Sequence, residues 1–203
     1  TARKRQENMQ DVPAAVSAFS RETLQNAGVD NIIDLENLTP NITMNETSGL
    51  VPGSIQVFIR GIGNDPGFDQ GVGIYVDDVY LNRTSGALLE VYDIERIEVL
   101  KGPQGNLYGR NTIGGAIKYI SRSPEQETRA NIEVKTGSDS LIKIKGGVSG
   151  ALSDNLLGGF SFSSTDRDGY QTNRFDGREY ASEDKMALRG TLLWNPSESV
   201  SVR

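Results

Sequence analysis

The sequence predicts a small mixed α/β domain followed by a series of long antiparallel strands. Short helix and strand signals, separated by turns rich in Gly, Asn, Asp and Pro, continue to about Pro124. From Ala130 onward, apolar and polar residues alternate with a period of two, which is typical of antiparallel strands. We therefore expect a flexible lead, an α+β domain and a strand region, at residues 1–11, 12–124 and 130–203 respectively.

The first domain is expected to begin with two short helices. Ser20 can cap a helix over 21–27, and Asp30 can cap a second helix that Thr39-Pro40 ends. Strand signals follow at 55–60, 72–80, 94–100 and 116–121.

The run from Ile94 to Ser123 carries the strongest local signal. It begins as an alternating strand, breaks at Gly102-Pro103 and ends as a second strand. Between the two strands lie Gly102, Gly105, Gly109, Gly114 and Gly115. Glycines this dense indicate backbone at positive φ, or backbone pressed against another surface.

Each expected strand after Ala130 has one apolar face, formed by residues such as Ile144, Phe160 and Leu192. Short connections at 153–155 and 195–197 alternate with a long polar loop over 167–183. The acidic residues of that loop lack the spacing of a twelve-residue calcium loop, so we expect a solvated loop there. The pattern fits two structures, a soluble β-sandwich with one wet face and a transmembrane β-barrel.

Composition excludes several functions. The chain has 27 acidic and 21 basic residues and a net charge of −6, which argues against a nucleic-acid partner. It contains no Cys and no His, so disulfides, His- or Cys-ligated metal and a Ser-His-Asp triad are excluded. Asp77-Asp78 is the obvious carboxylate pair, but neighbours on a strand point to opposite faces, so we interpret it as a turn or strand-end pair. We expect no cofactor, no metal and no catalytic residue.

Three stretches together resemble the plug domain of TonB-dependent outer-membrane transporters. They are SIQVFIRGIG from Ser54, GVGIYVDDVYL from Gly71 and GPQGNLYGRNTIGGAIKYISR from Gly102, in the family's order and spacing. The resemblance covers about Asp11 to Pro124. It implies an α+β plug domain followed by the first antiparallel strands of a transmembrane β-barrel, 22-stranded in the intact protein, in the outer membrane of a Gram-negative bacterium. Both chain ends are accordingly expected to be cut from a longer protein.

The resemblance also implies a function, which is TonB-dependent active import of a scarce nutrient, first of all a ferric siderophore or other iron complex. The implied partners are TonB with its inner-membrane energising complex, the small-molecule ligand and outer-membrane lipid. The TonB box is expected at or before Thr1. Three alternatives stay open: a transporter for a non-iron ligand such as cobalamin, a saccharide or an aromatic compound; a non-transporting signalling relative; and a soluble β-rich carbohydrate-binding or hydrolytic protein with Asp77 or Glu98 as acid.

Two sets of site residues follow from the same resemblance. Loops at the outward apex of the plug are expected to contact the ligand through Asn45, Asn64, Asp65, Phe68, Asn82 and Arg83. Charged plug residues are expected to form ion pairs with the barrel wall, because an unpaired buried charge is costly. These are Arg60, Glu95, Arg96, Glu98, Lys101 and Arg110.

Overall fold

The computed structural model describes residues 15–46, 54–63, 70–82, 93–197 and 200–203. The chain divides into two compact units, Thr1–Ser121 (unit 1) and Arg122–Arg203 (unit 2). Each unit is described by itself.

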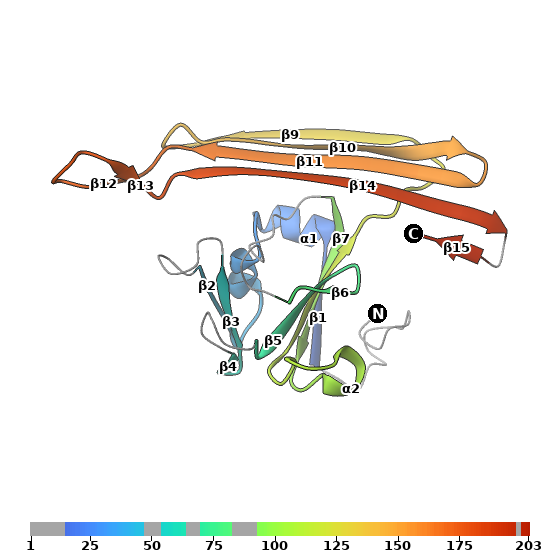
Figure 1. The fold of residues 1–203 in the computed structure, drawn as a ribbon, viewed down its shortest axis with the longest axis horizontal. Helices are drawn as coiled ribbons and strands as arrows, with labels where there is room; N and C mark the ends of the chain where they lie inside the picture. Colours follow the sequence, from blue (N-terminus) through green and yellow to red (C-terminus); the bar gives the residue numbers. More distant parts are fainter. Residues whose placement is uncertain (1–14, 47–53, 64–69, 83–92, 198–199) are drawn as a thin grey trace. The chain divides into compact units, whose positions relative to one another are not determined.

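Unit 1 contains a five-stranded sheet and a three-stranded sheet (Figure 1). The larger sheet has the order β1-β7-β8-β5-β6, formed by Ala15–Ser20, Ile94–Lys101, Gly115–Ser121, Val72–Val76 and Val79–Tyr80. Strands β8 and β5 are parallel, whereas the other pairs are antiparallel. The smaller sheet has the order β2-β3-β4, formed by Ile42–Glu46, Ile55–Ile59 and Ile62–Gly63. The predicted strands are confirmed, except that the strand expected at 72–80 is the hairpin of β5 and β6.

The helices of unit 1 differ in part from expectation. Helix α1 (Arg21–Asn26) is capped as predicted, because the Thr23 amide donates to Ser20 Oγ at 3.2 Å. The second helix is a 3₁₀ helix, η2 (Ile33–Leu38), and the prediction that Asp30 caps it is wrong. Instead, the Asp34 carboxylate accepts hydrogen bonds from the Asp30 and Asn31 amides at 2.8 and 3.0 Å, which satisfies donors ahead of the helix. A third short helix, α2 (Gly105–Tyr108), was not anticipated.

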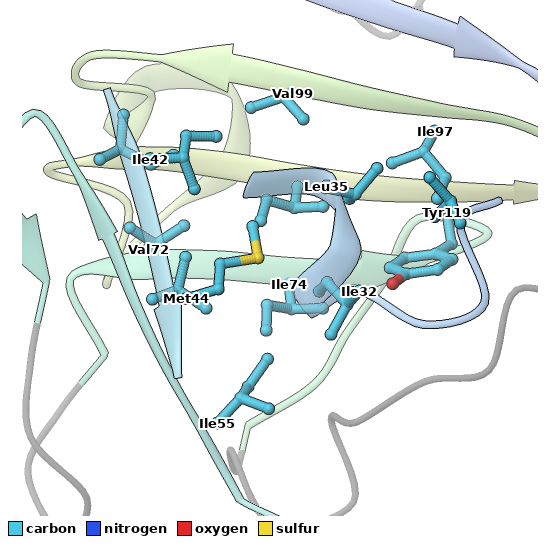
Figure 2. Packing of buried hydrophobic residues seen from close by; sticks show 14 of the residues in the cluster. Ile32, Leu35, Ile42, Met44, Ile55, Val72, Ile74, Ile97, Val99 and Tyr119 are labelled. Atoms are coloured by element: carbon cyan, nitrogen blue, oxygen red, sulfur yellow. The ribbon is translucent and has the colours of Figure 1, made fainter. Parts of the chain in front are cut away.

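The hydrophobic core of unit 1 lies between the two sheets and η2. Figure 2 shows Leu35 of η2 and Met44 of β2 packed with Ile74 of β5 and Ile97 of β7. All four side chains are buried. A second, smaller cluster packs on another part of the five-stranded sheet, and it consists of Tyr75, Leu100, Tyr108 and Ala116.

The dense glycines between β7 and β8 are explained by both predicted causes. Gly102, Gly109 and Gly115 have φ of 99°, 81° and 150°, a region that side chains strongly disfavour. Gly114 has no positive φ, but a Cβ there would lie 2.6 Å from the Ile62 carbonyl oxygen. Gly105 meets neither constraint, since a Cβ would find open space.

Unit 2 is an antiparallel sheet with the order β15-β14-β11-β10-β9 (Figure 1). Its strands are Val200–Val202, Glu183–Ser197, Leu156–Arg167, Ile142–Ser153 and Arg129–Thr136. The predicted long strands are confirmed, but the turn expected at 195–197 is wrong because β14 continues to Ser197. The long polar loop holds a small hairpin of β12 (Gln171–Thr172) and β13 (Glu179–Tyr180).

The two faces of this sheet have opposite character. The pairing register places Ile132, Gly146, Phe162 and Leu188 side by side on one face, which is apolar along most of its length. Its large side chains are exposed, among them Ile132 and Met186 at 73% each. The other face is polar and mainly basic, and it carries Arg129, Glu133, Lys135, Lys143, Lys145, Arg167, Glu183, Lys185 and Arg189. Several polar side chains of that face, such as Ser161, Ser163 and Thr165, are buried.

Within the described part of the chain, no helix is long and apolar enough to cross a membrane.

Candidate functional site

Charged side chains of alternating sign cross the five-stranded sheet of unit 1, and we call them the charge ladder. It consists of Glu95, Arg96, Glu98, Lys118 and Asp78. On β7, Arg96 contacts both Glu95 and Glu98, and its Nε lies 2.8 Å from Glu98 Oε1. Glu98 is the register partner of Lys118 on β8. Lys118 Nζ in turn lies 2.8 Å from Asp78 Oδ1 in the β5–β6 turn.

The ladder is buried in the middle and exposed at both ends. The side chains of Lys118 and Glu98 are 1% and 5% exposed, whereas those of Asp78 and Glu95 are 64% and 48% exposed. Removing a charged group from water is costly unless an opposite charge lies beside it. The alternation therefore places an opposite charge beside each of the two buried groups.

Tyrosines surround the buried lysine. Lys118 Nζ lies 5.5 Å from the centroid of the Tyr108 ring, within reach of a cation–π contact. The Tyr75 hydroxyl donates to the Tyr108 carbonyl at 2.6 Å, and the two rings meet edge to face at 5.2 Å. Burial, followed by the negative charges of Glu98 and Asp78, raises the pKa of Tyr108, and burial followed by Tyr80 raises that of Tyr75. Both tyrosines thus stay neutral at ordinary pH.

Asp77 and Asp78 form the turn between β5 and β6. Both have positive φ, 47° and 68°, as a two-residue type I′ hairpin turn requires. Asp77 accepts hydrogen bonds from the Ser121 amide, at 2.8 Å, and from the Ser121 hydroxyl, whereas Asp78 binds Lys118. The interpretation as a turn pair is confirmed, because the two carboxylates engage different partners.

The predicted plug–barrel set divides into two groups in the structure. Glu95, Arg96 and Glu98 contact one another on β7. The other three residues lie near the end of the five-stranded sheet that carries Lys101, the last residue of β7. Arg60 occupies the β3–β4 turn with φ of 53°, and its amide donates to Asn41. Lys101 Nζ lies 3.4 Å from the Pro40 carbonyl, and Arg110 Nη2 lies 3.5 Å from Asn82 Oδ1. Ion pairs with a barrel wall stay a prediction for all six residues.

The predicted ligand-contacting set is only partly described. Asn64, Asp65, Phe68 and Arg83 lie outside the described residues. The prediction that Asn45 lies in a loop is wrong, because it is an exposed residue of β2 opposite Gln56. Asn82 is exposed and lies beside Arg110. Contact of these residues with a ligand stays a prediction.

Sequence reasoning missed Lys118, Asp78 and Tyr108 as members of a charged cluster. The sequence does contain an indication of this cluster. Lys118 is the one charged residue in the apolar run Ala116–Ile120, and its neighbours on β8 are buried. A buried lysine requires a counter-ion, and the Asp77-Asp78 pair upstream could have been assigned to that role.

Comparison with known proteins identifies the first unit. The family model described as the TonB-dependent receptor plug domain matches residues 8–116. The vitamin B12 transporter BtuB of Vibrio vulnificus (strain YJ016) is 26% identical over 208 residues, which cover 100% of this chain and 33% of that protein. The pesticin receptor of Yersinia enterocolitica is 30% identical over 144 residues, covering 70% of this chain and 21% of the receptor.

The fold is also that of solved receptors. The ferric yersiniabactin uptake receptor FyuA from Yersinia pestis matches with a TM-score of 0.78 and 24% identity, over 89% of this chain and 28% of the receptor. The chain thus spans about a third or less of the length of these relatives. The family match overturns the alternative of a soluble β-rich carbohydrate-binding or hydrolytic protein. The two acids named for it have other partners, since Asp77 accepts from Ser121 and Glu98 pairs with Arg96. The chain belongs to the TonB-dependent receptor plug domain family, whose members are non-enzymatic receptors of the outer membrane of Gram-negative bacteria.

Proposed function

We propose that this chain is the N-terminal part of a TonB-dependent transporter that actively imports a scarce nutrient across the outer membrane. The match of residues 8–116 to the plug family is the observation that carries the proposal. The two units fit the two parts of such a transporter, a compact plug and the beginning of a strand-built wall.

Unit 2 supplies the first strands of a 22-stranded barrel in this proposal. Transmembrane barrels expose an apolar band to lipid and turn a polar face to the lumen. Exposed Ile132, Met186 and Leu192 lie on one face of the sheet, and Lys145 and Arg189 lie on the other. This arrangement supports an orientation in which the apolar face meets lipid and the basic face meets the interior.

The plug would gate the lumen and communicate with TonB and its inner-membrane energising complex. Ligand binding on the outer side would shift the plug's conformational ensemble, so that an N-terminal segment becomes available to TonB. Edge strand β1 (Ala15–Ser20) follows that segment in the chain, and none of its six side chains is fully buried. TonB could then pair with the released segment by strand addition.

The proposed ligand is a ferric siderophore or another iron complex. The name of FyuA, a ferric yersiniabactin uptake receptor, favours iron, while that of BtuB favours cobalamin as the alternative. We propose contacts through the apex residues named above, together with ion pairs from Arg60, Lys101 and Arg110 to acidic residues of the barrel wall. Arg60 and Lys101 lie near each other, because Arg60 Nη1 would be 3.9 Å from a Cβ on Gly102, the residue after Lys101.

Uptake by the whole receptor tests the proposal. The full gene is expressed in cells that lack their own receptors, with and without functional TonB, and the cells are offered radiolabelled ferric siderophores or cyanocobalamin. We expect TonB-dependent accumulation of an iron complex. Accumulation of cyanocobalamin alone would replace iron by cobalamin. A receptor found intact in the outer membrane that imports no offered compound in a TonB-dependent manner would contradict active transport of these ligands.

A further inference from the structure

Three segments of unit 1 approach one another at glycines, where no side chain separates their backbones. They are the end of β4 at Gly63, the residue before β5 at Gly71 and the residue before β8 at Gly114. A Cβ on Gly71 would lie 2.9 Å from Gly63 Cα, and one on Gly114 would lie 2.6 Å from the Ile62 carbonyl oxygen. None of the three glycines has a positive φ, so close approach alone demands glycine here. In Figure 1, β4 and the start of β5 lie together at the lower end of unit 1.

Backbone hydrogen bonds continue this contact to the edge of the five-stranded sheet. The Gly114 amide donates to the Gly71 carbonyl at 2.8 Å, and the Gly102 amide donates to the Gly114 carbonyl at 2.9 Å. Gly102 follows Lys101, the last residue of β7, whose register partner is Ala15, the first residue of β1. An unbroken series of backbone contacts therefore joins the β3–β4 hairpin to the N-terminal strand.

We propose that Gly63, Gly71, Gly114 and Gly102 form a backbone joint that couples the position of the β3–β4 hairpin to the attachment of strand β1. Contacts between backbones cannot be relieved by a change of rotamer, so displacement of one segment must move the next. At the far end, β1 is an edge strand. Its side chains are exposed or half-buried, and among the described residues β7 is its one sheet partner. A shift at Lys101 and Gly102 therefore acts on an edge strand of the large sheet that has no fully buried side chain.

The joint has a direct use in the proposed transporter. Strand β1 follows the N-terminal lead, so the joint would carry a change in the plug to the segment that TonB is proposed to bind. That use rests on the proposed function, whereas the coupling itself is a property of unit 1 and is measured without TonB or ligand.

Hydrogen exchange followed by mass spectrometry on the whole receptor in detergent tests the coupling. The variants are Gly71→Ala and Gly114→Ala, whose new methyl groups would meet backbone atoms. The matched control is Gly105→Ala, because a Cβ at Gly105 meets nothing within 4 Å and its φ is not positive. Overpacking of this kind destabilises the packed segments that it separates. We therefore expect β1 amides (15–20) to exchange about ten- to a hundredfold faster in both variants and at the unmodified rate in the control.

The opposite result is equally defined. If Gly71→Ala and Gly114→Ala accelerate exchange only in their own segments and leave β1 at the control rate, the joint does not couple them. If either variant fails to fold, hydrogen exchange of the unmodified receptor tests the proposal instead. We expect the amides of Gly102, Gly114 and β1 to exchange together in one correlated opening step, and independent exchange of these amides would overturn the proposal. Neither result depends on uptake, so failure of the coupling and failure of transport are separately visible.

Discussion

The two units bury opposite kinds of side chain. Among the described residues, unit 1 buries apolar side chains such as Leu35 and Ile97, and the buried charged residue Lys118 lies between Glu98 and Asp78. Unit 2 exposes residues such as Met186 and Leu192 and buries polar ones such as Ser161. Strand β3 of unit 1 and strand β14 of unit 2 alternate in burial with the same period of two, so this period specifies a strand but not its solvent. Whether the apolar or the polar residues of an alternating strand are exposed depends on the surroundings of each sheet face.

Removal of the buried lysine should give the largest effect. Lys118→Ala removes the cation that pairs with Asp78 and lies opposite Glu98 in the strand register, and it leaves a cavity beside Tyr108. We expect a loss of about 3–5 kcal/mol in the stability of unit 1. Lys118→Met should lose less, because it restores packing. The measurement is native-state hydrogen exchange of core amides of β7 and β8 in the whole receptor.

The control for this variant is Arg21→Met, since Arg21 is a half-buried cation at the start of helix α1 and belongs neither to the ladder nor to the expected plug–barrel set. We expect little change there. Equal effects at Lys118 and Arg21 would show that the ladder contributes nothing special to unit 1.

The same leucine truncation should have unequal effects in the two units. Leu35 is 0% exposed and Leu188 is 57% exposed. Leu35→Ala should destabilise unit 1 by about 2–5 kcal/mol, through lost transfer energy and a cavity. Leu188→Ala should cost well under half of that. Unfolding in urea, followed by exchange in each unit separately, measures both.

A charge at Leu188 sharpens the comparison further. If the apolar face meets lipid, Leu188→Arg should destabilise the inserted receptor by about 2–4 kcal/mol near the bilayer midplane. On a face bathed in water the same change would be nearly neutral. Folding of the receptor into lipid vesicles at increasing urea distinguishes the two results, and Lys185→Arg on the polar face is the control.

Alkaline pH should weaken unit 1 through its buried tyrosines. Burial first raises the pKa of Tyr75, Tyr108 and Tyr119 above the ordinary value near 10. Because the folded pKa is the higher one, the stability they contribute is constant below pH 10 and is lost as pH rises above it. Each such tyrosine should lower the free energy of unfolding by up to about 1.4 kcal/mol per pH unit in that range. Tyrosinate absorbance and exchange, measured together between neutral pH and pH about 11, check this; unchanged stability would contradict it.

Local sequence signals anticipated much of this fold. Ser20 caps α1 because a hydroxyl at that position satisfies a free amide, and glycines between β7 and β8 reflect backbone constraints that other residues cannot meet. Strand β2 was missed because Ile42–Glu46 is short and only Ile42 and Met44 are buried. Its pairing with β3 is a tertiary contact that sequence alone does not encode locally.

The candidate site was less predictable than the fold. Charged residues of β7 were identified, but their partners were sought in the barrel, whereas Arg96 and Glu98 pair along their own strand. Lys118 was overlooked because an apolar strand with one charge resembles an edge strand with a polar face. The salt bridge to Asp78 arises from the β5–β6 turn, whose place beside β8 depends on parallel pairing of β5 with β8.

The smallest effect is expected at Tyr119, on the core side of the same strand. Its hydroxyl is buried and has no hydrogen-bond partner within the described residues. Since an unmade hydrogen bond contributes nothing and its donor has lost water, Tyr119→Phe should leave stability at neutral pH unchanged or raise it by up to about 1 kcal/mol. Above pH 10 the variant should lose less stability than the unmodified receptor, by one titrating group. A marked loss of stability in Tyr119→Phe at neutral pH would instead mean that the hydroxyl has a bound water or another polar partner. The core of unit 1 would then contain a satisfied buried polar group, and the contrast with unit 2 would be weaker.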